Sequence, residues 1–278
     1  MFYMGFLISI EGGEFTGKSS LIVPSLKKIL ELSGYDVRVS REPGGTLKGE
    51  EIRSKIFNRL SEGASQEELA LLFNEARKIH LQDIIFPFLG SNRNKEGVLI
   101  LDRFLDSTIV YQGLEGGVDL KKLVSYEKEY ANSFYPDITL ITFFPENKFN
   151  KTFEMRRNFA NTNDKEKRSQ TKWDEGEVAF HLQRQRHYLS LPDFYKKMGI
   201  ERNFTTIDSS KHPYEVIKES VVKTSQLFKE DKKEIFLEKY KELVLKKEWE
   251  EFNEIWEKQH ELYRIEREGN SIVRGKER

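Results

Sequence analysis

A glycine-rich run near the start of the chain holds the residues best suited to bind phosphate. Residues 12–19 follow the pattern G-x-x-x-x-G-K-S directly after an apolar, β-type stretch. Glycines let backbone amides surround a phosphate, Lys18 can reach the β and γ phosphates of a nucleotide, and Ser19 can ligate Mg²⁺. The pattern predicts an ATP-binding loop that consists of Gly12, Gly13, Glu14, Phe15, Thr16, Gly17, Lys18, Ser19 and Ser20.

A carboxylate and an arginine follow a second strongly apolar run, residues 98–101. This run is typical of a buried strand, so Asp102 and Arg103 would stand at the carboxyl edge of the sheet, where open α/β sheets bind ligands. Asp102 can hold Mg²⁺ through water, together with Ser19. Arg103 fits beside a metal site when a second anion is bound there. These residues predict phosphoryl transfer from a nucleoside triphosphate to an anionic acceptor.

The elements that would position these residues alternate between β-type and helical patterns. Short β-rich runs recur at residues 6–10, 37–40, 98–101, 138–144 and 204–207, separated by segments with helical periodicity. That alternation predicts an α/β fold with a doubly wound, five-stranded parallel sheet flanked by helices. A long helical stretch is expected over residues 66–88, and Gly34 is placed to end the first helix in the left-handed conformation.

Composition and charge exclude several classes of protein. The 46 basic and 46 acidic side chains balance, so no global charge favours nucleic acid or an anionic membrane as a partner. The chain has no cysteine and no apolar run of membrane-spanning length, and we expect a soluble, cytoplasmic protein. The histidines show no metal-ligand spacing and are expected to be structural or solvated; they are His80, His181, His187, His212 and His260.

Two segments differ from the rest in composition. Residues 158–176 are polar and predict a mobile loop or lid, with the whole lid at about 150–176. Residues 229–278 are highly charged and helical in pattern, and we expect them to form a C-terminal extension to a domain of residues 1–228. Aromatic residues on one helical face of this extension are expected to dock on the domain, on a second subunit or on a partner: Trp249, Phe252, Trp256 and Tyr263.

Five segments together resemble the thymidylate kinase (dTMP kinase) family of P-loop nucleoside monophosphate kinases. They are IEGGEFTGKSS, REPGGT, LFNEAR, DRFLDSTIVYQG and the pair Ile207-Asp208, in this order along residues 5–228. The resemblance implies a P-loop NTPase fold, a homodimer, and conversion of dTMP to dTDP with Mg²⁺ and ATP. The second and fourth segments are far more diagnostic than the P-loop alone.

The resemblance also implies roles for individual residues in binding dTMP. Two arginines would hold the 5′-phosphate, an aromatic ring would stack on thymine, and polar side chains would contact the base edge and the sugar. In this sequence the phosphate residues are Arg53 and Arg103; the thymine residues are Phe73, Arg77, Thr108 and Gln112; and the sugar residues are Tyr111 and Glu14.

The sequence departs from the family pattern at the catalytic arginine. Family members place it in the P-loop or in the lid, and Phe15 stands at the P-loop position. The lid candidates are Arg156, Arg157 and Arg168, and our hypothesis is that Arg156 or Arg157 supplies it. Relatives show D-R-x-E before the next helix, where this chain has Thr171, Lys172, Trp173 and Asp174; Phe104 also replaces a common Tyr or His.

Two other functions compete with a dTMP kinase. A kinase of another nucleotide or of a deoxynucleoside would keep the P-loop, but Arg53 and Arg103 would be redundant for an acceptor without a phosphate. A non-catalytic nucleotide-binding scaffold would not need Lys18, Ser19 and Asp102 together. A phosphate acceptor is already ionised near neutral pH, since its second pKa is about 6, and this explains a site with cations and no obvious general base.

Overall fold

The protein is built on one parallel sheet. The computed structural model describes residues 5–90, 97–162 and 176–246. The strands are β1 (Phe6–Gly12), β2 (Asp36–Arg41), β3 (Gly97–Asp102), β4 (Ile138–Phe143) and β5 (Phe204–Asp208), in the order β2-β3-β1-β4-β5. Each pair of neighbours is parallel, which confirms the predicted α/β class and the five strands.

Helices connect the strands, as parallel pairing requires. The expected helix over residues 66–88 is continuous in the structure, although it passes through a π-helical turn, and Gly34 has the expected left-handed backbone with φ +89°. The helices are α1 (Val23–Leu32), α2 (Leu47–Ser61), α3 (Gln66–His80), α4 (Phe86–Gly90), α5 (Leu105–Thr108), α6 (Leu120–Ala131), α7 (Glu146–Thr162), α8 (Val178–Lys197), α9 (Pro213–Thr224) and α10 (Glu230–Lys246), with short turns η1 (Lys18–Ile22), η2 (Leu81–Ile85), η3 (Ile109–Glu115) and η5 (Ser225–Leu227).

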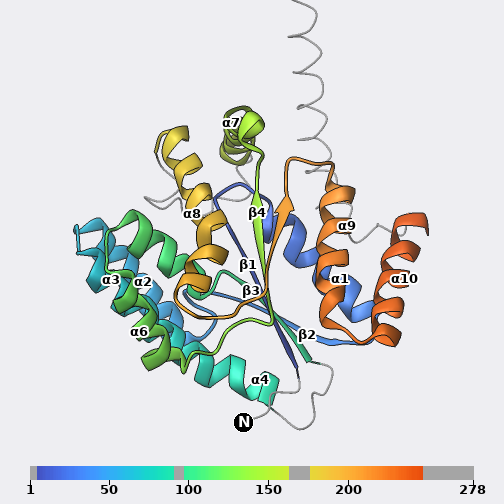
Figure 1. Ribbon diagram of the computed structural model, residues 1–278, viewed down its shortest axis with the longest axis horizontal. Coiled ribbons are helices and arrows are strands. Elements are labelled where there is room, and N and C mark those ends of the chain that lie inside the picture. The colour runs from blue at the N-terminus through green and yellow to red at the C-terminus, as the bar shows by residue number, and fades with distance from the viewer. Residues whose placement is uncertain (1–4, 91–96, 163–175, 247–278) are drawn as a thin grey trace, which may run out of the picture.

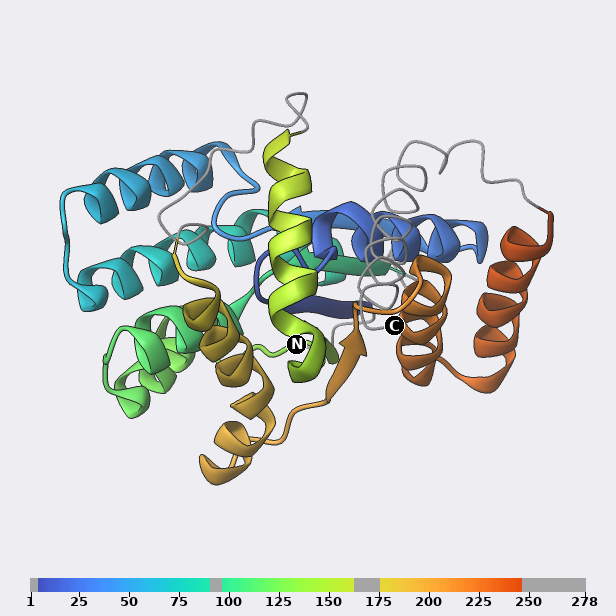
Figure 2. The same ribbon diagram turned by 90° about the horizontal axis from the view of Figure 1, so that it is seen from above.

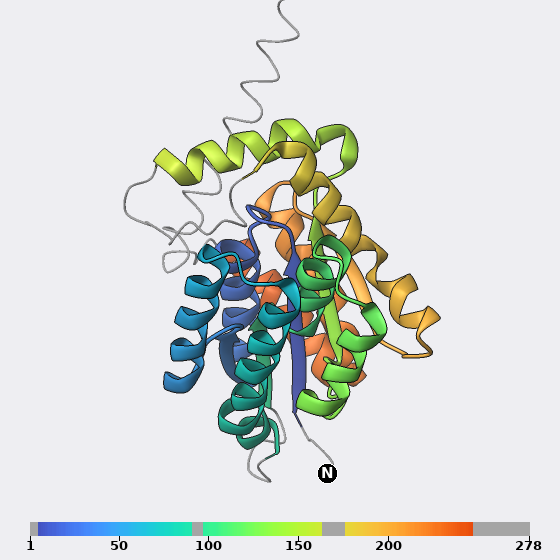
Figure 3. The ribbon, with the colours of Figure 1, turned by 90° about the vertical axis from the view of Figure 1, so that its left-hand side faces the viewer.

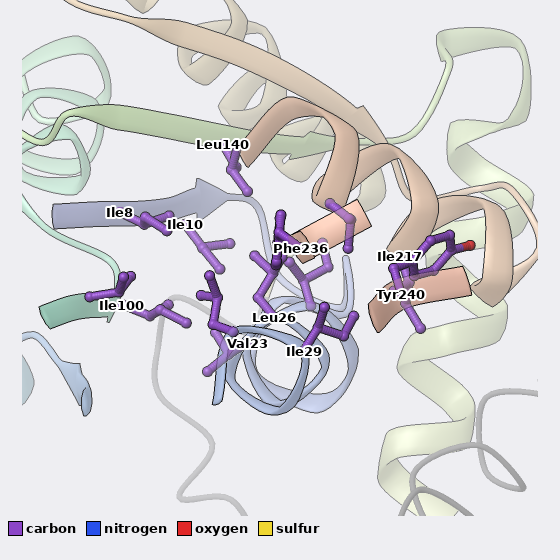
Figure 4. Packing of buried hydrophobic residues seen from close by; sticks show 14 of the residues in the cluster. Ile8, Ile10, Val23, Leu26, Ile29, Ile100, Leu140, Ile217, Phe236 and Tyr240 are labelled. Atoms are coloured by element: carbon purple, nitrogen blue, oxygen red, sulfur yellow. The ribbon is translucent and has the colours of Figure 1, made fainter. Parts of the chain in front are cut away.

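The helices cover both faces of the sheet (Figure 1). Successive side chains of a strand point to opposite faces. Ile8 and Ile10 of β1 therefore join the core formed with α1, α9 and α10, which Figure 4 shows from close by, whereas Leu7 joins the cluster under α4. Helices α2, α3, α6 and α8 lie on this second side (Figure 1). Both faces of the central strands are thus apolar, as expected of a buried parallel sheet.

The first part of the predicted C-terminal extension packs on the domain. Phe236, Tyr240 and Leu243 of α10 are buried in the core with α1 and α9. Phe228, just before α10, stacks on Tyr35 with ring centroids 4.7 Å apart. Residues 247–278, with the aromatic residues predicted to form a docking face, lie outside the described residues, and so their docking remains a prediction.

Helix α7 occupies part of the segment expected to be a lid. The loop was predicted to begin at residue 158, but α7 continues through Thr162, so this boundary is wrong. The reason is that the alanine at its end favours a helix, and the asparagines and the phenylalanine beside it are weaker helix formers that a helix tolerates. Seen from the side (Figure 3) and from above (Figure 2), α7 lies across the carboxyl ends of the strands. Residues 163–175 lie outside the described residues.

None of the described helices combines the length and the apolar character that crossing a membrane requires.

Candidate active site

The P-loop follows β1 and is seated on β4. Gly12 has φ +132°, and a Cβ there would lie 2.3 Å from the Thr142 hydroxyl oxygen, so only glycine fits. The Thr142 hydroxyl donates to the Glu11 carbonyl (2.9 Å), and its oxygen is 2.6 Å from the Thr16 hydroxyl. These contacts hold the loop in place before any phosphate is bound.

Lys18 is buried inside this loop. Its ammonium group donates to the Gly13 carbonyl and, over 3.4 Å, to the Thr16 hydroxyl. Burial and the neighbouring Arg103 cation lower the pKa of Lys18 to about 7, although Asp102 and Glu14 oppose this. A bound phosphate would favour the charged form. The side chain predicted to bind phosphate, Lys18, therefore lies in the loop. The charge of its amine depends on what occupies the site.

Ser19 and Asp102 form the pair expected to hold a metal ion. The Ser19 hydroxyl donates directly to the Asp102 carboxylate, across the P-loop and the end of β3. A hydroxyl and a carboxylate oxygen are the hard ligands that Mg²⁺ accepts, and substrate phosphates commonly complete its shell. Among the described residues, no group of three or more His, Asp and Glu side chains could hold a metal by itself. The residues present fit Mg²⁺ carried by a nucleotide.

Arg103 lies between the P-loop and the predicted dTMP side. Its backbone has φ +69°, and its N–H donates to the Ile10 carbonyl over 3.1 Å. One guanidinium nitrogen donates to the Gly12 carbonyl (2.9 Å) and to the Tyr188 hydroxyl (2.6 Å). The guanidinium is also 5.6 Å from the centre of the Tyr111 ring. Arg103 therefore joins the two halves of the site.

A buried carboxylate, Glu11, supports the Arg103 turn. It accepts the Phe104 backbone N–H (2.6 Å) and the Ser107 hydroxyl (2.8 Å). Burial and nearby Asp106 raise the pKa of Glu11 to about 7, against the opposing effect of Arg103. Phe104, at the position where relatives were expected to carry a polar residue, is buried and belongs to the apolar cluster under α4. Its place in the core accounts for an apolar residue there.

Arg77 is anchored by side chains from two other elements. Its Nε donates to Glu42 over 2.8 Å, and a second nitrogen donates to Thr108 over 3.0 Å. Glu42 also contacts the ring of buried His80, with a nitrogen–oxygen distance of 2.9 Å. The REPGGT segment, α3 and α5 are thus joined by one chain of polar contacts. Arg53 is tied to the same segment, where it donates to the Pro43 carbonyl over 2.9 Å.

The predicted base residues lie on α3, on η3 and, for Thr108, at the end of α5. Phe73 is half-buried beside the cluster of Ile56, Leu69 and Leu72. Gln112 is 1% exposed, and its amide nitrogen has no hydrogen-bond partner among the described residues. Buried donors are rarely left unpaired in proteins. An unpaired amide at this position is what a residue that awaits a polar ligand would show.

Glu14 is the centre of the site's charge network. Its carboxylate accepts from Arg184 (2.9 Å) and Arg103 (3.3 Å), and the Tyr111 hydroxyl donates to it. His181 lies 3.3 Å from the same group. Burial alone would raise the pKa of Glu14, but the His181 hydrogen bond and the arginines hold it well below its usual value. Glu14 is therefore a fixed anion beside the P-loop.

The residues of α8 are the main functional feature that the sequence analysis missed. His181, Arg184 and Tyr188 are all buried and all contact P-loop residues or Arg103. The expectation that the histidines are structural or solvated did not give His181 a place beside the P-loop, where its ring lies 3.3 Å from the Glu14 carboxylate. The sequence does contain a signal for this cluster, because spacings of three and four residues place these three side chains on one face of a helix. That face is polar where a core face would be apolar.

The structure separates the candidate catalytic arginines. Arg156 lies at the P-loop: it donates to the Phe15 carbonyl over 3.5 Å and to the Ser209 carbonyl over 2.7 Å. Arg157 instead donates to the Gly176 carbonyl over 3.1 Å, at the start of the segment before α8. Arg168 and residues 171–174 lie outside the described residues. Of the two arginines in the hypothesis, only Arg156 contacts the phosphate loop.

Comparisons with known proteins agree on one family. The family described as thymidylate kinase matches residues 10–221. A thymidylate kinase from Mesoplasma florum is 34% identical over 230 residues, which cover 81% of this chain and 99% of that protein. One from Chlamydia muridarum is 40% identical over 141 residues, 50% of this chain and 66% of that protein. A crystal structure of thymidylate kinase from Ehrlichia chaffeensis has a similar fold, with a TM-score of 0.55 at 22% identity over 81% of this chain and 99% of that one.

Proposed function

The chain belongs to the thymidylate kinase family, and from that premise we propose that it transfers the γ-phosphoryl group of ATP to the 5′-phosphate of dTMP, giving dTDP and ADP. The family match includes the P-loop and the dTMP-side segments. Most of a relative's length is shared, so the proposal concerns a whole enzyme and not an isolated nucleotide-binding module.

One observation carries the proposal: a single arginine adjoins both halves of the site. Arg103 donates to the Gly12 carbonyl of the P-loop and lies over the ring of Tyr111, on the element that also bears Gln112. An arginine between two polyanions can neutralise charge on both and hold them in line. This placement supports a phosphorylated acceptor, which a nucleoside would not provide.

The transfer follows from alignment and charge. An ionised oxygen of the dTMP phosphate attacks the γ-phosphorus of ATP, a new oxygen–phosphorus bond forms, and the bond to the bridging oxygen breaks so that ADP leaves with the electron pair. Lys18, Arg103 and Arg156 would neutralise the charge that spreads over the transferred group. No base is required, because the acceptor oxygen has already lost its proton near neutral pH.

The remaining groups would bind and orient the substrates. Mg²⁺, held by Ser19 and Asp102, would neutralise phosphate charge when it is bound with ATP. Arg53 would join Arg103 on the dTMP phosphate, and Phe73 would stack on thymine. The base edge would meet Arg77 and Gln112, beside Thr108, and the sugar would lie by Tyr111 and Glu14.

The proposal extends to the setting of the enzyme. It includes a homodimer, which the family resemblance supports, and a cytoplasmic location, with which a chain that has no cysteine is compatible. Sedimentation of the purified protein at micromolar concentration tests the dimer. A monomer at all concentrations would contradict that part.

A chromatographic assay tests the activity itself. Purified protein is incubated with Mg²⁺, ATP and, separately, dTMP, dUMP, dCMP, dGMP, AMP or thymidine, with Lys18→Ala as the control. We expect equal amounts of dTDP and ADP from dTMP, with dUMP as the only other acceptor, and a large loss of rate in the control. Phosphorylation of thymidine or of another nucleotide in place of dTMP would assign a neighbouring kinase. Binding of ATP without any transfer would assign a scaffold.

A further inference from the structure

Phe15 has a backbone conformation that aromatic residues rarely adopt. It stands within the P-loop with φ +61°, the left-handed region. For a residue with a Cβ this conformation costs roughly 1–2 kcal/mol. Such strain persists where surrounding contacts over-determine it, and it is concentrated at functional sites.

The Phe15 ring is held by helix α7. It packs edge-on against Phe153, with centroids 5.3 Å apart and planes at 81°. Phe153 is buried and stacks on Phe149 at 5.5 Å, in a cluster that also includes Phe144. The contact joins the P-loop to α7 across more than a hundred residues of sequence.

The same helix carries Arg156, three residues after Phe153 and therefore on the same side of the helix. Arg156 donates to the Phe15 carbonyl over 3.5 Å, and its guanidinium lies 5.1 Å from the centre of the Phe144 ring. The guanidinium nitrogen that donates to Phe15, Nη1, also lies 3.6 Å from the point that a Cβ on Gly17 would occupy. The guanidinium is thus placed directly over the phosphate loop.

We propose that Phe15 is a positioning residue, whose ring holds α7 against the P-loop through Phe153 and so keeps Arg156 over the phosphates. The inference rests on the proposed function, in which Arg156 neutralises the transferred group. Phe15 does not itself touch the reacting atoms in this role. Its left-handed backbone turns the carbonyl toward Arg156 and the ring toward Phe153, and these two contacts account for the strain.

Phe15→Gly isolates the ring. Glycine adopts φ +61° freely and keeps the carbonyl that Arg156 contacts, so only the aromatic group is lost. We expect kcat to fall about tenfold, while KM for ATP and the Kd of Mg²⁺-ADP change less than about twofold. Phe15→Tyr retains the ring at this half-exposed position and should leave amide exchange in α7 as it is in the original chain.

A double variant tests whether the ring acts through the arginine. Arg156→Ala alone should lower kcat by about a hundredfold or more. In that background Phe15→Gly should change kcat less than about twofold, since there is no guanidinium left to position. An equal fall in both backgrounds, or a rise in KM for ATP with unchanged kcat, would overturn the proposal.

Hydrogen–deuterium exchange of the full chain provides a readout that does not depend on turnover. Phe15→Gly should speed amide exchange in α7 around Phe153, and unchanged exchange there would overturn the anchoring role. If Arg156→Ala makes dTDP at the normal rate, the positioning role is overturned while the dTMP kinase function stands. If the unsubstituted chain makes no dTDP, the proposed function fails, and exchange in α7 still decides whether Phe15 anchors the helix.

Discussion

Arg184 and Glu14, 170 positions apart in the sequence, form a buried ion pair with a nitrogen–oxygen distance of 2.9 Å. The same guanidinium binds Glu115 through two nitrogens, at 2.8 and 3.0 Å. Its centre lies 4.3 Å from that of the Tyr111 ring. One arginine of α8 therefore holds together the P-loop, the residues after α5 and a ring expected to face the sugar.

Removing that guanidinium should destabilise the protein. Arg184→Gln leaves Glu14 and Glu115 buried without their shared cation, and breaking a buried pair in this way typically costs about 3–5 kcal/mol. Urea unfolding at neutral pH measures the loss. Arg186→Gln is the matched control, because Arg186 is on the same helix in an exposed pair with Glu146 and should leave the free energy of unfolding unchanged. Equal stability of the two variants would contradict the role of the network.

Gln112 should matter for the acceptor and not for folding. Its amide nitrogen is unpaired among the described residues, so Gln112→Leu removes a buried donor that the free protein does not use. We expect KM for dTMP to rise about tenfold, KM for ATP to stay the same, and the melting temperature to stay the same or rise. A lower melting temperature with unchanged KM would show that the amide is structural.

Nucleotide binding should take up a proton at alkaline pH. The pKa of Lys18 is lowered to about 7 in the free site, so at pH 8 the Lys18 amine is neutral in most molecules. Bound phosphates would raise this pKa again, and the amine would then take up a proton. Titration calorimetry with Mg²⁺-ADP at pH 8, in buffers of different ionisation enthalpy, should show nearly one proton bound. Lys18→Arg stays charged and should show none. Equal enthalpies in all buffers for the original chain would refute this prediction.

Glu127 should make the free energy of unfolding depend on pH. Its carboxylate lies far from the P-loop in sequence and accepts hydrogen bonds from the hydroxyls of Tyr195 (2.7 Å) and Tyr135 (3.0 Å). Burial raises the pKa of Glu127 from 4.5 to about 7. The folded state then holds more protons than the unfolded state between these values, so this group lowers stability as pH rises through that window, by up to about 3 kcal/mol.

Substitution separates this effect from other titrations. Glu127→Gln should remove the slope that Glu127 contributes to the free energy of unfolding between pH 4.5 and 7. Glu129→Gln, at an exposed position of the same helix, should leave the slope unchanged. Identical pH profiles for the two variants would show that Glu127 titrates normally.

The sheet and the phosphate loop were predictable because their information is local. A short apolar run, a glycine pattern and a helix start within about twenty residues specify β1, the P-loop and α1 with few alternatives. The end of α7 was not predictable from the sequence, because the polar residues near position 160 are compatible with either a helix or a loop. The helix is held instead by Phe149 and Phe153, which pack in a buried cluster with Phe144.

By itself, the sequence determined the fold class, the family and the pair of Ser19 and Asp102, since strand ends in a parallel sheet meet at one edge whatever the packing above them. Only the tertiary structure decided the roles around Glu14 and Arg156. The charge of Glu14 depends on His181 and Arg184 from a distant helix, and the position of Arg156 depends on the rings of Phe15 and Phe144. Burial and electrostatic coupling act between residues far apart in the chain, and spacing along the sequence does not record them.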